Sequence, residues 1–145
     1  MIPNLINSKP PMGYAVCLSE TCPLREKCLR ALLGEEIRHT AETMNLVNPQ
    51  HPNYREGAEC VHFRSSEPEK YARGFSRAMS ELSKRNYSAL SERLRAETSK
   101  TQFYRMKKGE IALSPREQAE IIALLRAYGY TGDDPFDSYE ERLTW

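Results

Sequence analysis

The sequence of 145 residues predicts a mainly α-helical protein, and three observations support this prediction. Helix-capping residues precede amphipathic segments throughout the second half of the chain. No segment has the alternating pattern of a convincing strand. The four cysteines all lie within the first 60 residues, in a region poor in amphipathic segments. We expect an extended arm over residues 1–16, a four-cysteine region over 17–65 and a helical bundle over 66–145, with the last two forming one compact unit.

The four-cysteine region has few signals for regular structure. Residues 1–16 contain three prolines and two asparagines without periodicity, which indicates an extended arm. Pro23 suits the first position of a helix that Gly34 either ends or kinks. Residues 45–60 contain two prolines, three asparagines and a glycine, so we expect a loop that carries the chain back toward the first three cysteines.

Two helices are expected between residues 66 and 98. The first begins at Ser66, with Pro68 in its first turn. Its predicted buried face consists of apolar residues at helical spacing: Tyr71, Phe75, Ala78, Met79 and Leu82. The second begins at about Ser88 and buries Leu90 and Leu94.

Three further helices are expected in the last third of the chain. One is capped by Ser99 and closed by Gly109. The next begins with Ser114, Pro115 and Glu117, which is the pattern of a capping box. Its predicted buried residues are Ile121, Ile122, Leu124, Leu125 and Tyr128, and Gly129 ends it. A short helix is expected over 136–145.

The cysteines follow the spacing C-x4-C-x5-C-x31-C, at Cys17, Cys22, Cys28 and Cys60. Soft thiolate ligands select zinc or iron–sulfur clusters. We therefore expect a site in which these four cysteines bind zinc, with an iron–sulfur cluster as the alternative cofactor, and with His62 as a substitute or supporting group. Such a metal would staple the N-terminal third to the helices. Buried or redox-active thiols remain the other interpretation.

Two resemblances involve these cysteines. The segment CPLREKCL is similar to the cysteine motif of WhiB-like iron–sulfur regulators, although Cys17 lies five residues before Cys22 rather than three. The segments YAVCLSETCPLREKCLR, CVHFRS, YARGFSRAM and FYRMKKGEIALSPREQ resemble a family of uncharacterised small bacterial four-cysteine proteins. The second resemblance implies a cytoplasmic, metal-binding protein without an assigned activity.

The net charge of +1 conceals a strongly uneven distribution. Residues 1–69 carry seven basic and nine acidic side chains, residues 70–108 carry eleven and three, and residues 109–145 carry three and eight, which gives −2, +8 and −5. A basic middle section can attract nucleic acid or an acidic protein partner. It can equally be a solvated surface that pairs with the acidic ends of the same fold.

Residues 90–130 resemble the DNA-binding half of helix-turn-helix repressors. The resemblance implies a recognition helix whose projecting residues are Lys100, Thr101, Gln102 and Arg105. Lys107 and Lys108 would contact phosphates of the DNA backbone. Phe103 and Met106 would then face inward. The turn over 95–98 lacks the usual glycine. The predicted function is a regulator that contacts nucleic acid, with DNA as the candidate partner, through residues 70–108, and the alternative is a protein-interaction or adaptor module.

Other classes of function find no support in the sequence. No apolar run is long enough for a membrane span, and the N-terminus lacks the pattern of a secretory signal, so we expect a cytoplasmic protein without a membrane partner. No nucleophile–base set, carboxylate pair or glycine-rich phosphate loop is present. We therefore expect no enzyme activity and infer no small-molecule substrate.

Overall fold

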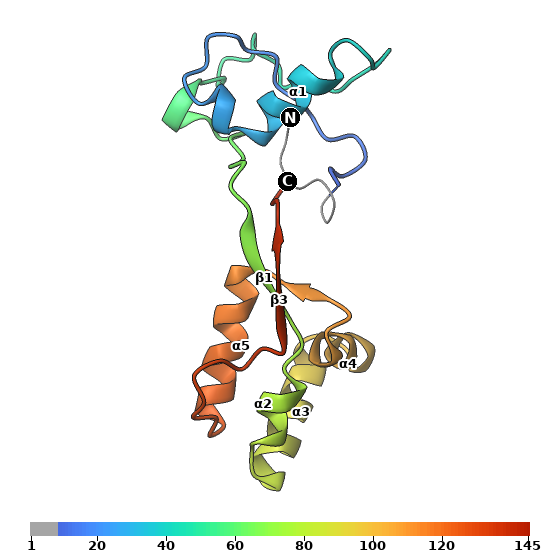
Figure 1. Ribbon diagram of the computed structural model, residues 1–145, viewed down its shortest axis with the longest axis vertical. Helices are drawn as coiled ribbons and strands as arrows, with labels where there is room; N and C mark the ends of the chain where they lie inside the picture. Colours follow the sequence, from blue (N-terminus) through green and yellow to red (C-terminus); the bar gives the residue numbers. More distant parts are fainter. Residues whose placement is uncertain (1–8) are drawn as a thin grey trace. The chain divides into compact units, whose positions relative to one another are not determined.

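The computed structural model describes residues 9–145 and divides into two compact units (Figure 1). One comprises residues 1–68 with 142–145, and the other comprises 69–141. Residues 1–8 of the expected arm lie outside the described residues. The described part contains five α-helices and a three-stranded sheet. The prediction of a mainly α-helical fold is therefore wrong, and the fold is mixed.

The N-terminal unit contains one helix, α1 (Leu29–Ile37), and two 3₁₀ turns, η2 (Arg25–Lys27) and η3 (Gly57–Glu59). The helix begins later than Pro23, and Cys28 occupies its N-cap position. It also continues through Gly34. A glycine is needed at this position because the segment that carries Cys17 crosses α1 closely. A Cβ atom on Gly34 would lie 2.6 Å from the carbonyl oxygen of Cys17.

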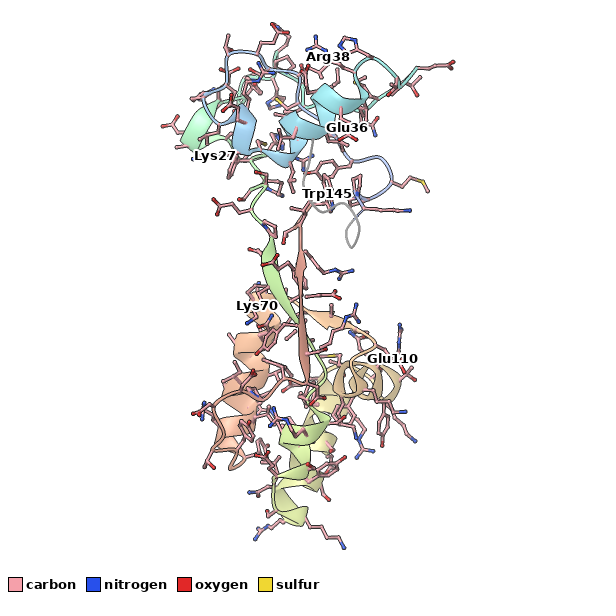
Figure 2. All side chains as sticks on the ribbon, in the orientation of Figure 1. Lys27, Glu36, Arg38, Lys70, Glu110 and Trp145 are labelled. Atoms are coloured by element: carbon pink, nitrogen blue, oxygen red, sulfur yellow. The ribbon has the colours of Figure 1, made fainter. Side chains whose placement is uncertain are left out.

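This unit has an apolar core of its own. Its buried members are Val16, Leu29, Leu33 and Leu143. Trp145, labelled in Figure 2, packs edge-to-face on Tyr14 with their ring centroids 5.3 Å apart. The final residues of the chain thus add apolar side chains to a core that the first part of the chain begins, and burial of these side chains stabilises the unit.

The 69–141 unit combines helices with the sheet (Figure 1). Its elements in chain order are β1 (Glu69–Arg73), α2 (Ser76–Ser80), α3 (Lys84–Glu97), α4 (Lys100–Lys108), β2 (Ala112–Leu113), α5 (Pro115–Ala127) and β3 (Ser138–Arg142), whose last residue belongs to the other unit. The strand order is β2–β1–β3, and β1 runs antiparallel to β2 with Ala72 opposite Leu113. The core residues Phe75, Leu90 and Phe103 are buried between these elements.

The helix caps predicted at Ser99 and Ser114 are confirmed, whereas α3 begins at Lys84, earlier than the predicted start at about Ser88. Ser83, Ser99 and Ser114 each cap a helix by accepting a backbone N–H, from Asn86, Gln102 and Glu117. The capping box at Ser114 is complete, because the side chain of Glu117 accepts the Ser114 N–H in return. Gly109 ends α4 with a φ of 88°, a left-handed conformation that glycine adopts without strain.

Strands replace the first part of one predicted helix, which α2 continues, and the middle of another. The segment expected to begin a helix at Ser66 forms β1, and the expected final helix over 136–145 forms β3. Gly74 separates β1 from α2, with a φ of +72° and no room for a Cβ atom beside Asp137. The expected helical bundle with a helix-turn-helix-like arrangement is therefore replaced by helices packed with a sheet, although only Thr98 and Ser99 separate α3 from α4.

Candidate functional site

Helix α4 is fixed to its unit at the C-terminal end. The carbonyl oxygen of Lys107 accepts hydrogen bonds from the Phe75 N–H at 3.1 Å and the Ser76 hydroxyl at 2.9 Å. Arg73 donates to the carbonyl oxygen of Gly109 at 2.9 Å. Phe103 anchors the middle of the helix, because its side chain is buried in the core. The orientation of α4 within the 69–141 unit is therefore well defined.

The opposite side of α4 is a polar, exposed surface. Its exposed residues are Lys100, Thr101, Gln102, Tyr104, Arg105 and Lys108, and we call this set the α4 face. Tyr104 was not predicted as a site residue, although its spacing of four residues from both Lys100 and Lys108 places it on the same side of a helix. Met106 is half-buried and packs against the core.

Two of the predicted cationic residues have partners within the unit. Lys107 is half-buried, and its Nζ donates a hydrogen bond to the Tyr87 hydroxyl at 2.8 Å. The same ammonium lies 5.1 Å from the ring centroid of Tyr104. Arg105 pairs with Glu110, which lies just beyond α4 (Figure 2), at 3.4 Å, but both side chains are more than half exposed. Such an exposed pair opens at little cost.

Acidic side chains between residues 133 and 141 bond to parts of the unit other than the α4 face. The Asp134 carboxylate accepts a hydrogen bond from the Tyr139 hydroxyl at 2.6 Å. Asp137 accepts the Ser76 N–H at 3.2 Å, and Glu140 pairs with Arg73 at 3.0 Å. These contacts leave the α4 face exposed within the 69–141 unit.

The four cysteines form a second candidate site, in the N-terminal unit. Cys17, Cys22, Cys28 and Cys60 all line one cavity of about 20 Å³, and His62 lines it as well. Cys28 is buried and the other three are half-buried. The predicted return of the loop over residues 45–60 toward the first three cysteines is confirmed.

The carboxylate of Glu56 joins the two cysteine-bearing segments. It accepts hydrogen bonds from the hydroxyls of Ser19, Thr21 and Tyr54, the last two at 3.0 and 3.2 Å. The bond from Ser19, with those from Thr21 and Tyr54, holds the pKa of Glu56 below its usual value against the opposing effect of burial. Burial in turn raises the pKa of Tyr54 to about 12. Sequence patterns gave no signal for this cluster, because its members are far apart in the chain.

The cysteine cavity is not a metal centre in this fold. Within residues 9–145, no group of three or more His, Cys, Asp or Glu side chains is placed to hold a metal ion. The expected metal-stapled region is therefore wrong as a description of the structure. Zinc or an iron–sulfur cluster at these cysteines remains a prediction from the sequence alone. Elemental analysis of anaerobically purified protein tests it.

These features define a protein with a mixed α/β unit that exposes a basic helix and a second unit that carries a four-thiol cavity. The chain belongs to a family of unknown function, DUF6078, whose model matches residues 1–145. The expected membership of an uncharacterised family is thereby confirmed, and the family has no assigned activity. No curated protein and no solved structure matches the chain. None of the helices in the described part is long and apolar enough to cross a membrane.

Proposed function

We propose that this protein is a cytoplasmic regulator that binds duplex DNA by placing the α4 face in the major groove. The observation that carries the proposal is the division of α4 into a buried side, anchored by Phe103, and the exposed α4 face. An α-helix fits the width of the major groove of B-form DNA. The resemblance to small bacterial four-cysteine proteins further implies a bacterial source.

The side chains on the α4 face suit both kinds of contact with DNA. Lys100, Arg105 and Lys108 can each neutralise a phosphate, and phosphate contacts supply most of the sequence-independent affinity. Gln102 can pair with the N6 and N7 atoms of adenine through its amide. Its backbone N–H is already bonded to the Ser99 hydroxyl, which holds the first turn of the helix in place. The basic charge of +8 over residues 70–108 favours approach to a polyanion.

The proposal is tested by measuring the affinity of the full chain for a mixed-sequence duplex at several salt concentrations. We expect the logarithm of the binding constant to fall linearly with the logarithm of salt concentration. Replacing Lys100, Arg105 and Lys108 with glutamine should reduce that slope by about 0.9 for each lost phosphate contact.

The matched control removes the same charge from other surfaces. Lys9, Lys27 and Arg116 are exposed and lie outside α4, so their replacement with glutamine should change the slope much less. Equal losses of slope in both triple variants would show that only net charge matters. Absence of binding by the unmodified protein at low salt would contradict the proposal.

A protein-interaction or adaptor module is the second candidate, and a different observation favours it. Leu18, Leu46 and Val61 of the N-terminal unit are exposed, with Val61 at 75%. Leu46 and Val61 line the same surface pocket, and exposed apolar side chains that cluster in this way mark protein interfaces. Binding of a protein partner that persists at high salt and is lost in a Leu46→Ser, Val61→Ser variant would favour this function over DNA binding.

A further inference from the structure

The DNA-binding proposal leaves the four-thiol cavity without a role. All four cysteines are free thiols, and they line a single cavity of about 20 Å³. A volume of that size holds about one water molecule. The four cysteines thus reach one small space, although they come from sequence positions up to 43 residues apart (17 to 60).

The four cysteines differ in the segments that hold them. Cys28 is 8% exposed, occupies the N-cap position of α1 and forms an isolated antiparallel β-bridge with Ser65 through its backbone. Cys17 donates its N–H to the carbonyl oxygen of Arg30 at 3.0 Å, and its own carbonyl lies against Gly34. These two cysteines are therefore fixed against α1. Cys22 and Cys60 lie outside the helices and strands and are half-exposed.

The segments that carry Cys22 and Cys60 are held together on both sides of Cys22. Thr21, the residue before it, donates a hydrogen bond to the Glu56 carboxylate. Pro23, the residue after it, lies against Gly57, whose Cβ position is 3.2 Å from the proline ring. Cys60 donates its N–H to the carbonyl oxygen of Gly57 at 3.1 Å. These contacts hold the segments of Cys22 and Cys60 together at the cavity that both residues line.

We propose that Cys22 and Cys60 are an oxidation site, at which a hydroperoxide produces a reversible disulfide within the chain. One thiolate attacks the peroxide oxygen, which breaks the O–O bond, forms a sulfenic acid and releases an alcohol or water. The second thiolate then attacks that sulfur, which forms the S–S bond and releases water. Two thiols lose two electrons in total, and the hydroperoxide gains them.

The disulfide would close the chain between residues 22 and 60 and lock the loop around Glu56 onto the segment around Ser19. A small thiol reductant would reverse it by exchange. The N-terminal unit would then respond to peroxide, whereas the α4 face belongs to the other unit and does not depend on this chemistry.

The experiment counts thiols in the full chain. Protein purified under reducing, anaerobic conditions is treated with one equivalent of hydrogen peroxide, and free thiols are titrated after denaturation. We expect the count to fall from four to two, and a peptide map should join the fragments that contain Cys22 and Cys60. Dithiothreitol should restore all four thiols.

Three single variants identify the pair. Cys22→Ser and Cys60→Ser should each keep their three remaining thiols after peroxide treatment, whereas the matched control Cys17→Ser should fall from three thiols to one. If a variant does not fold, the peptide map of the unmodified protein still decides the pairing. A disulfide involving Cys17 or Cys28, disulfides only between chains, or an equimolar zinc content that protects all four thiols would overturn the proposal.

Discussion

The ammonium group of Lys107 donates a hydrogen bond to the hydroxyl of Tyr87, with 2.8 Å between Nζ and the oxygen. This contact links α4 to α3, and it distinguishes two neighbouring lysines that look equivalent in the sequence. Lys107 is half-buried and lies over the aromatic rings of Tyr87, Phe103 and Tyr104, whereas Lys108 is exposed. The first stabilises the helix pair and the second is available to a partner.

Separate substitutions of these lysines should therefore have different effects. Lys108→Gln should leave the free energy of unfolding nearly unchanged and weaken binding to all duplex sequences, with a salt slope lower by about 0.9. Lys107→Gln should destabilise the 69–141 unit by about 1 kcal/mol, because it removes a hydrogen bond and a cation–π contact. Chemical denaturation and salt-dependent binding measure the two effects. Identical behaviour of the two variants would contradict this division of roles.

Gln102 should affect the preference among DNA sequences more than the overall affinity. Gln102→Ala removes an amide that can read adenine, so discrimination at one base position should fall by about 1–3 kcal/mol while the salt slope stays the same. Selection from a randomised duplex pool, carried out with both proteins, measures the preference. Gln50→Ala, which removes the same side chain at an exposed position outside α4, is the control. An unchanged set of selected sequences would exclude Gln102 from base contact.

Gly34→Ala should destabilise the N-terminal unit, contrary to helix propensity. Alanine favours a helix interior over glycine by about 1 kcal/mol. Here, however, the added Cβ would meet the Cys17 carbonyl oxygen at 2.6 Å, so the crossing segment must shift, at a cost of about 1–3 kcal/mol. Glu36→Ala, an exposed change in the same helix, is the control. Denaturant titration of both variants checks the sign, and a stabilised Gly34→Ala protein would refute the close crossing.

The Asp134–Tyr139 contact predicts a defined dependence on pH. The hydrogen bond from Tyr139 lowers the pKa of Asp134 below 3.8, so its contribution is present above that value and is lost as the pH falls through the lowered pKa. Tyr139→Phe should therefore be less stable than the unmodified protein at neutral pH. The difference between the two free energies of unfolding should shrink well below pH 3.8. A difference that stays constant with pH would indicate lost packing instead.

The sequence by itself determined the helices whose signals are local. Ser99 and Gly109 mark the two ends of α4, and the capping box of Ser114 and Glu117 marks the start of α5. These signals are local because capping depends on groups within one turn of the helix. The helix-turn-helix resemblance implied that Lys100 and Gln102 are exposed and that Phe103 faces inward, and the structure places them so. The sequence also predicted that Cys60 returns to the first three cysteines.

Only the tertiary structure decided which segments became strands and how the cysteines are arranged. Tyr71 and Phe75 have helical spacing, but β1 gains its hydrogen bonds from strands far along the chain, and Arg73 pairs with Glu140 at a separation of 67 residues. Leu143 likewise completes a core made mainly by the first 33 residues. The spacing of the cysteines can bring their side chains to one cavity, but it cannot set the distances between sulfur atoms, because those depend on contacts such as Glu56 with Ser19. Local patterns determine helices through short-range hydrogen bonds, whereas strand pairing and ligand geometry depend on residues that only folding brings together.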